Sequence, residues 1–257
     1  MLALLAQLAA TPGDPAANAQ RAADAIRAHP QADLAVFPEL YLSGYDLALL
    51  DGASRESGCD ELARVAAAAE EADTAVVIGF SETLPAGGRA NAAACIDRDG
   101  ALVAVYRKSQ LFGAEAEAFE PGGELRVVRL AGRSVGVMIC FDVEFPEVAR
   151  RLARAGADLL VTASANMDPF YRDHEVATCA RALENRLPHL YANMVGEAGG
   201  VRFVGGSRSV GSGGEVLGEA AHDGEELLLV RVGDAGVDDE RVDYLRHLPA
   251  DVPVVAS

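Results

Sequence analysis

The stretch that decides the fold is LRVVRLAGRSVGVMICFDVEFPE, residues 125–147. Residues 125–130 alternate between apolar and polar side chains, and residues 134–140 form a nearly unbroken apolar run, so two strands are predicted, the second one buried. Pro146 then favours the start of a helix. A sharp turn between a strand and a helix holds a nucleophile above the carboxyl edge of a sheet. Cys140 is therefore a candidate nucleophile, and the alternative is a core cysteine at a strand end.

Composition limits the classes of protein that this chain can represent. The chain has 257 residues, 50% of them hydrophobic, and no repeat or linker divides it, so we expect one domain over 1–257 with an extended tail at about 241–257. The formal net charge of −17 argues against binding to nucleic acid or to an anionic membrane surface. No apolar run approaches the about 20 residues of a membrane span. The four scattered cysteines favour a reducing cytoplasm over disulfides or a zinc site.

Short apolar runs alternate with amphipathic segments along the whole chain. The predicted strands are 2–8, 33–37, 74–80, 91–96, 101–106, 159–163, 189–195, 201–204, 206–210 and 225–232. The predicted helices are 15–29, capped by Asp14, and 60–72, 146–155 and 173–186. Because this order mixes strand–helix–strand units with hairpins, we expect a mixed sheet arrangement with helices outside it.

Three chemically capable side chains each follow the end of a predicted strand: Glu39, Lys108 and Cys140. Ligand chemistry in such folds gathers at the carboxyl ends of strands. Lys108 is the only lysine among 22 Lys and Arg residues, and its compact ammonium can hold an oxyanion in a site too cramped for a guanidinium. A thiol needs a base, and a carboxylate whose pKa is raised by burial can serve as one. Taken singly, Glu39 is more simply an ordinary loop carboxylate, and the alternative for Lys108 is a lysine retained by chance on a solvated strand end, but the trio favours catalysis.

The local sequences FPELYLSGY, YRKSQLFG and ICFDVEFPE, in this order, resemble motifs of the nitrilase superfamily of carbon–nitrogen hydrolases. The resemblance runs from Leu2 to about Leu245, nearly the whole chain. It implies an α/β fold, a four-layer αββα sandwich of two mixed β-sheets with helices outside. It also implies a homodimer or higher homo-oligomer, with no metal and no organic cofactor.

Carried onto these positions, the resemblance implies a role for each catalytic residue. Cys140 is the expected nucleophile and Glu39 the expected general base. Lys108 and the backbone N–H of Phe141 are the expected donors to the oxyanion.

Further acidic and polar residues are weaker candidates. The second active-site glutamate that the resemblance implies is best matched by Glu115, with Glu117 as the alternative. Glu144 and Asn166 are candidate substrate-binding residues, although structural hydrogen bonding is the simpler interpretation of both. Asp142 is interpreted as a carboxylate that fixes the turn, with an arginine as a candidate partner. None of the histidines lies in a recognisable Cys-His signature, so each is expected to be solvated or in the core.

The predicted function is cysteine-dependent hydrolysis of a small linear carboxamide to carboxylate and ammonia through a thioester. The motifs resemble those of amidases acting on short aliphatic or ω-amino amides. The alternative is an N-carbamoyl amine amidohydrolase, which releases ammonia and carbon dioxide. A nitrilase, a Cys-His-Glu amidotransferase domain or a catalytically silent protein with the same fold is less favoured. We expect a cytoplasmic enzyme that acts on a small-molecule amide, with neither nucleic acid nor membrane as partner.

Overall fold

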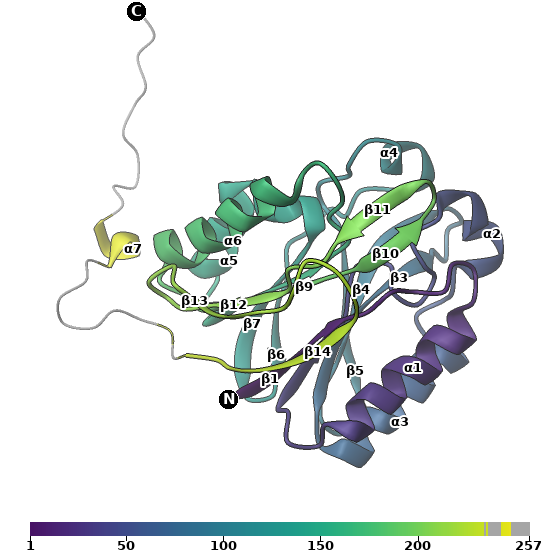
Figure 1. Ribbon diagram of the computed structural model, residues 1–257, viewed down its shortest axis with the longest axis horizontal. Helices are drawn as coiled ribbons and strands as arrows, with labels where there is room; N and C mark the ends of the chain where they lie inside the picture. Colours follow the sequence, from purple (N-terminus) through teal and green to yellow (C-terminus); the bar gives the residue numbers. More distant parts are fainter. Residues whose placement is uncertain (234, 236–242, 248–257) are drawn as a thin grey trace, which may run out of the picture.

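The computed structural model describes residues 1–233, 235 and 243–247. Two six-stranded sheets pack face to face, and a pair of helices covers the outer face of each sheet (Figure 1). This arrangement is the predicted four-layer αββα sandwich, so the predicted fold class is confirmed.

The first sheet is built from the N-terminal part of the chain and completed by a late strand. In spatial order its strands are β14 (Glu226–Arg231), β1 (Leu2–Gln7), β2 (Leu34–Val36), β3 (Ala75–Thr83), β4 (Arg89–Ile96) and β5 (Leu102–Arg107). The β1, β2 and β3 strands are parallel, whereas β14, β4 and β5 are antiparallel to their neighbours. Helices α1 (Pro15–Ala28) and α3 (Asp60–Ala72) cover its outer face. Asp14 caps α1 as predicted, because its side chain accepts a hydrogen bond from the N–H of Ala17 at 3.0 Å.

The second sheet is built from the middle and later parts of the chain. In spatial order its strands are β13 (Val216–Glu219), β12 (Arg208–Val210), β9 (His189–Asn193), β8 (Leu159–Ser164), β7 (Arg133–Ile139) and β6 (Val127–Leu130). The β7, β8 and β9 strands are parallel, and the other three are antiparallel to their neighbours. Helices α5 (Pro146–Arg154) and α6 (Tyr171–Asn185) cover its outer face, and β10 (Val195–Ala198) pairs with β11 (Val201–Val204) in a separate hairpin.

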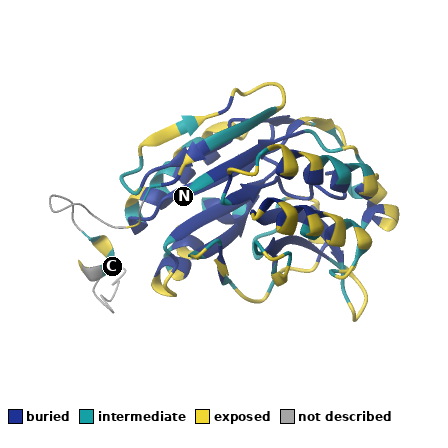
Figure 2. Ribbon diagram, turned by 90° about the horizontal axis from the view of Figure 1, so that it is seen from below, coloured by how far each residue is buried: buried dark blue, intermediate teal, exposed yellow. Residues whose placement is uncertain are grey.

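The alternation of side chains along the strands produces the four layers. In β1, Leu5 packs between the two sheets, whereas Leu4 packs against the layer of α1 and α3. In β7, Val137 faces the first sheet and Met138 faces α5. Successive residues of a strand point to opposite faces, so a strand buried on both faces must be apolar throughout. Figure 2 shows the buried strands between helices whose outer faces are exposed.

Several short elements complete the described chain, and most were not predicted. They are η1 (Leu47–Leu49), α2 (Leu50–Ala53), α4 (Glu115–Ala118), η2 (Cys140–Glu144) and α7 (Tyr244–His247). The edge strand β13 was also missed. Cys59, predicted to lie in a loop, is the N-cap of α3, and its sulfur accepts a hydrogen bond from the N–H of Leu62 at 3.4 Å. The predicted extended tail at 241–257 lies outside the described residues except for 243–247, where α7 is helical.

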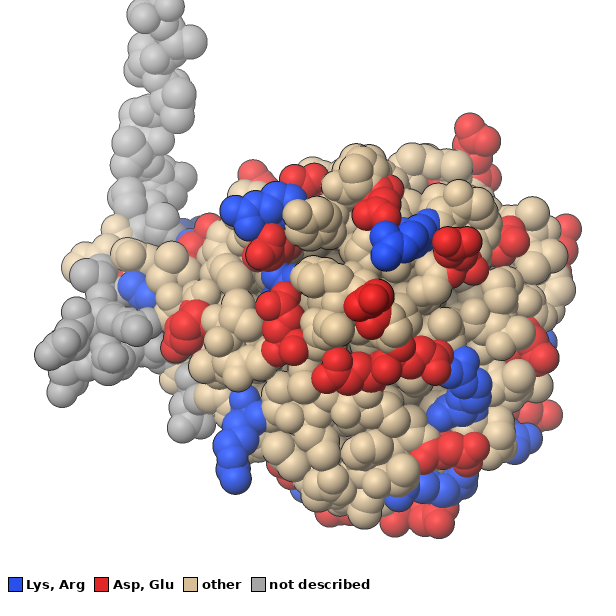
Figure 3. All heavy atoms as spheres, in the orientation of Figure 1, with Lys and Arg blue, Asp and Glu red and all other residues tan. Residues whose placement is uncertain are grey.

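The surface reflects the acidic composition of the chain. Figure 3 shows acidic side chains spread over one face of the molecule, with fewer basic side chains between them. Within the described ranges, no helix combines the length and the apolar character that a membrane span requires.

Candidate active site

The ends of β2, β5 and β7 bring the three predicted catalytic side chains to one region of the molecule. Glu39 follows β2, Lys108 follows β5 and Cys140 follows β7. Lys108 and Cys140 line the same pocket, and Glu39 lies directly behind Lys108, in contact with its ammonium. Residues that are far apart in the sequence therefore meet where the two sheets face each other.

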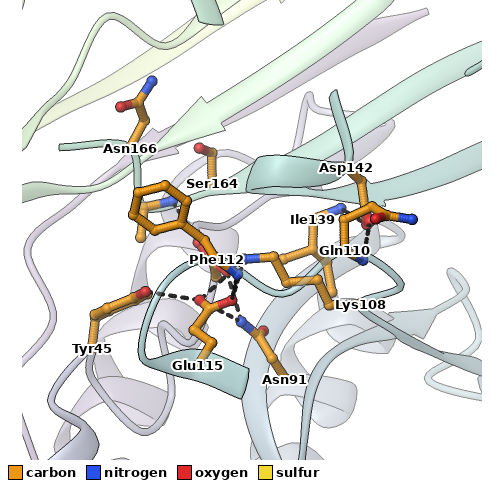
Figure 4. Close-up of polar contacts among 12 residues, drawn as sticks. Tyr45, Asn91, Lys108, Gln110, Phe112, Glu115, Ile139, Asp142, Ser164 and Asn166 are labelled. Carbon is orange, nitrogen blue, oxygen red and sulfur yellow. Dashed lines mark hydrogen bonds and ion pairs between the residues drawn. The ribbon is translucent and has the colours of Figure 1, made fainter. Parts of the chain in front are cut away.

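Lys108 is the centre of a buried charge cluster. Only 1% of its surface is exposed, and its Nζ lies 2.6 Å from Oε1 of Glu39. The same Nζ lies 2.8 Å from Oε2 of Glu115 (Figure 4). Burial lowers the pKa of Lys108, but the adjacent carboxylates outweigh it and raise the pKa above its usual value. The ammonium therefore stays protonated, and it can donate hydrogen bonds to a developing negative charge.

Glu39 is fully buried and held by donors on both oxygens. Besides Lys108, its Oε1 accepts a hydrogen bond from Nδ2 of Asn91 at 2.7 Å, and its Oε2 accepts one from the N–H of Ala165 at 3.0 Å. On the neighbouring strand, a Cβ on Gly79 would lie 2.6 Å from the Cα of Glu39, so only glycine permits this close approach. Burial raises the pKa of Glu39 to about 7, although Lys108 opposes the change. This carboxylate can therefore both accept and return a proton near neutral pH.

Glu115, the better match for a second active-site glutamate, also contacts Lys108. It is fully buried, and besides Lys108 it accepts hydrogen bonds from the hydroxyl of Tyr45 at 2.8 Å and from the N–H of Phe112 at 2.9 Å. The structure places the alternative, Glu117, at the surface. Figure 4 shows Tyr45, Asn91 and Lys108 converging on Glu115. Glu115 is thus a second carboxylate that holds the ammonium of Lys108.

Cys140 does not end the strand as predicted but begins the 3₁₀ turn η2. Its φ is +42°, a left-handed conformation that is uncommon for residues other than glycine and that clusters at functional sites. Burial raises the pKa of the Cys140 thiol well above its usual value, and Glu39 adds to the rise while Lys108 opposes it. The resting thiol is therefore protonated, and attack by its sulfur requires a base to take the proton.

Asp142 fixes this turn, as predicted, but not through an arginine. Its carboxylate accepts hydrogen bonds from the hydroxyls of Tyr106 at 2.7 Å and Ser109 at 2.8 Å. It also accepts them from the N–H groups of Gln110 at 3.0 Å and Ile139 at 2.9 Å. Because Ser109 and Gln110 directly follow Lys108, Asp142 joins the turn that holds Cys140 to the loop that holds the lysine.

The pocket that contains Cys140 is small, with a free volume of about 20 Å³, close to the space that one water occupies. Its lining also includes the predicted residues Phe141, Glu144 and Asn166. His174, which the sequence analysis assigned to the core or to solvent, is buried and lines it as well.

A chain of hydrogen bonds leads from this pocket into the second sheet. Nε2 of His174 lies 3.2 Å from Oε1 of Glu144, and its Nδ1 lies 2.8 Å from the hydroxyl of Tyr191. That hydroxyl lies 2.9 Å from Oγ of Ser164, and Ser164 in turn lowers the pKa of the Cys140 thiol. The described part of the chain holds no cluster of three or more His, Cys, Asp or Glu side chains suited to a metal ion.

Sequence reasoning missed Asn91, Tyr45 and His174. A signal existed for Asn91, since it is a polar residue at the start of an otherwise apolar predicted strand, where an unpaired amide would be costly. Tyr45 and His174 gave no comparable signal, because their partners are distant in the sequence.

Comparisons with known proteins agree with this geometry. Residues 2–239 match the carbon–nitrogen hydrolase family. The chain is 38% identical over 222 residues to an (R)-stereoselective amidase of a Pseudomonas species, covering 85% of this chain and 80% of that protein. Two solved structures of mutants of the amidase from Nesterenkonia sp. AN1 are 33% identical and cover 97% of this chain and 94% of their own. One, with a TM-score of 0.85, shows covalent addition of the acetamide moiety of fluoroacetamide at the active-site cysteine. The other, with a TM-score of 0.86, is a complex with butyramide.

Proposed function

The chain belongs to the carbon–nitrogen hydrolase family as an amidase of the nitrilase superfamily, and we propose that it cleaves a small linear carboxamide through a thioester on Cys140. The observation that supports this most is the contact of 2.6 Å between the buried side chains of Lys108 and Glu39, beside the pocket that Cys140 lines. A buried ammonium, a base with a pKa near 7 and a thiol are the groups that acyl transfer requires.

In the first step, the sulfur of Cys140 forms a bond to the amide carbon. The proton of the thiol passes to Glu39, and the carbonyl π electrons move onto the oxygen. The resulting oxyanion accepts hydrogen bonds from Nζ of Lys108 and from the backbone N–H of Phe141. Glu115 keeps the ammonium in place throughout, since it contacts Nζ with both carboxylate oxygens, at 2.8 and 3.0 Å.

In the second step, the carbon–nitrogen bond breaks and Glu39 gives its proton to the departing nitrogen, which leaves as ammonia. The acyl group remains on sulfur as a thioester. Glu39 then takes a proton from a water, and the water oxygen attacks the thioester carbon. When the carbon–sulfur bond breaks, Glu39 gives this proton back to the sulfur of Cys140 and the carboxylic acid product leaves. Amide and water thus give acid and ammonia, with every proton transfer assigned to a group of this chain.

The test is a screen for released ammonia over short primary amides and N-carbamoyl amines, with Cys140→Ala as the control. We expect ammonia from the amides and none from the variant. Release of carbon dioxide together with ammonia would favour the alternative, an N-carbamoyl amine amidohydrolase, and acid formed from a nitrile would favour a nitrilase. A chain that releases no ammonia from any of these compounds would be catalytically silent.

Alkylation provides a second test of the nucleophile. Iodoacetamide at neutral pH should modify Cys140 faster than the partly exposed Cys59 and Cys179, because only Cys140 has a base and an ammonium beside it. Equal rates at the three thiols would contradict the role of Cys140.

The expected homodimer and the cytoplasmic location are also part of the proposal. Light scattering of the purified chain would test the first, because a monomeric mass in dilute solution would contradict it. Cell fractionation would test the second.

A further inference from the structure

The reaction pocket that Cys140 lines is smaller than the substrates proposed above. Its free volume of about 20 Å³ is close to the space that one water occupies, and butyramide is several times larger than a water. A second and larger cavity, which we call the side cleft, adjoins this pocket. Its free volume is about 350 Å³, and Leu47, Ala48 and Val201 are among the residues that line it. Space for the rest of a substrate therefore exists beside the reaction pocket.

Three side chains separate the side cleft from the reaction pocket, since they line both cavities: Tyr45, Phe112 and Met167. On its other sides the cleft is bounded by η1, by the loop before α4 and by the turn of the β10–β11 hairpin. Because the two cavities share one wall, movement of a side chain in this wall would join them.

Two of the three side chains in this wall are held by specific contacts. The hydroxyl of Tyr45 donates to Oε1 of Glu115 at 2.8 Å, and its ring packs edge-on against Phe203 with centroids 5.5 Å apart. The ring of Phe112 packs edge-on against two other phenylalanines of the reaction pocket, with centroids 5.2 and 5.5 Å apart. Displacing either ring would break these contacts, so neither ring is suited to open the wall.

The third side chain, that of Met167, is held less firmly. It makes no hydrogen bond within the described residues and packs only through apolar contacts, in a cluster with Ala165 and Met194. A methionine side chain has three rotatable bonds and adapts to irregular space. The backbone of Met167 is fixed, because its C=O accepts a hydrogen bond from the N–H of Phe170 at 2.8 Å. Met167 can therefore change rotamer while its loop stays in place.

We propose that Met167 is a movable partition, and that the side cleft, once joined to the reaction pocket, holds the far end of an unbranched acyl chain. Ammonia is the leaving group in the proposed reaction, so the acyl chain is the only part of the substrate that can extend past Met167. The apolar side chains of Leu47 and Val201 suit such a chain. This inference rests on the proposed amide hydrolysis and deepens it, because it favours acyl chains longer than the short ones expected from the sequence.

Two unbranched amides, butyramide and the longer hexanamide, test the side cleft. We expect the wild type to show a kcat/KM about tenfold higher for hexanamide, because each of its two further methylene groups contributes up to about fourfold when buried. Ala48→Trp fills the cleft and should reduce this ratio about tenfold. The control is Ala86→Trp, which places the same side chain in the exposed turn between β3 and β4, outside both cavities. The control should leave the ratio unchanged.

The partition itself is tested by two substitutions of Met167. Met167→Ile retains an apolar side chain of similar size, but branching at Cβ restricts its rotamers, so the ratio for hexanamide over butyramide should fall towards one. Met167→Ala removes the partition and should keep the ratio at or above the wild-type value. A ratio that falls equally in both variants would show that Met167 only packs the core, and would overturn the partition.

Each outcome of the test with two amides is decisive. A wild-type ratio of one or less, or the same ratio in Ala48→Trp and the wild type, would overturn the side cleft as a subsite while leaving amide hydrolysis intact. Hydrolysis of neither amide would instead refute the proposed function itself.

Discussion

The two walls of the pocket use charge in different ways. The buried wall, formed by Glu39, Lys108 and Glu115, is at most 1% exposed, and each of its carboxylate oxygens accepts at least one hydrogen bond. The open wall, formed by Glu144 and His174, is partly exposed, and the carboxylate there has one oxygen without a partner among the described residues.

This difference separates two tasks. Charges that are fully paired cannot reorient, so they are preorganised for one transition state. A carboxylate with an oxygen that no protein group contacts can bind a ligand that replaces water there, so it discriminates between ligands. We therefore assign the reaction to the buried wall and the choice between charged and neutral substrates to the open wall. The predictions below test this division.

The largest effect is expected at the buried wall, from Lys108→Arg. A guanidinium is wider than an ammonium and cannot occupy the space between Glu39 and Glu115 without displacing one of them. We expect kcat to fall at least about 100-fold, the typical loss of an oxyanion donor, although the charge is retained. The measurement is ammonia release from saturating butyramide.

The matched control for this prediction is the reverse substitution at the preceding residue, Arg107→Lys. Arg107 is exposed and contacts Glu82, outside the pocket. The Arg107→Lys substitution should therefore leave kcat unchanged. Near-normal turnover of Lys108→Arg would remove Lys108 from the reaction.

The next effect is the pH dependence of kcat/KM. Glu39 must be ionised to accept the thiol proton, and its pKa is raised to about 7. Lowering the pH below 7 protonates it, so kcat/KM for butyramide should fall by about tenfold for each pH unit below that value. Circular dichroism at each pH would verify that the chain stays folded. A rate constant that is independent of pH from 5 to 8 would exclude Glu39 as the base.

Local signals in the sequence predicted most of the longer strands and helices. The apolar run ending near Cys140 and the proline at position 146 predicted β7 and the start of α5, because both signals act within a few residues. The three catalytic candidates were found by their place at strand ends and by motif. The αββα layering came from the family resemblance, since periodicity alone does not say which sheet faces which.

What the sequence could not predict depends on contacts between distant segments. Cys140 has a positive φ, and the turn that holds it is tied by Asp142 to the loop after Lys108. The open wall forms because α6 places His174 beside Glu144. Nothing near His174 in the sequence indicates this partner, so a histidine with no motif was assigned to the core or to solvent.

A smaller effect on the buried wall is expected from Asn91→Leu. Nδ2 of Asn91 donates to Oε1 of Glu39 at 2.7 Å and to Oε1 of Glu115 at 3.3 Å. A donor to the ionised carboxylate lowers its pKa, so its removal should raise the pKa of Glu39 and move the acidic limb of the pH profile to higher pH. We expect kcat/KM to fall about threefold at pH 7 and to recover at higher pH, as a one-proton profile requires. A loss of the same size at every pH would indicate a purely structural role.

The smallest effect is expected on the open wall, from Tyr191→Phe. The hydroxyl of Tyr191 lies 2.8 Å from Nδ1 of His174, and the loss of this hydrogen bond should weaken the positioning of Glu144 by about the free energy of one hydrogen bond. β-Alaninamide carries an ammonium where butyramide carries a methyl group, and the ratio of kcat/KM for β-alaninamide over butyramide should fall about threefold. The control is Tyr41→Phe, because Tyr41 is also fully buried but its hydroxyl has no hydrogen-bond partner within the described residues.

The same variant also tests whether the two walls are independent. The hydroxyl of Tyr191 lies 2.9 Å from Oγ of Ser164, and Ser164 lowers the pKa of the Cys140 thiol, so a path from the open wall to the nucleophile exists. If Tyr191→Phe changes the substrate ratio but not the pH profile, this path positions Glu144 only. If it shifts the pH profile and leaves the ratio unchanged, the hydrogen-bond chain serves the thiol instead, and the division of tasks between the two walls is wrong.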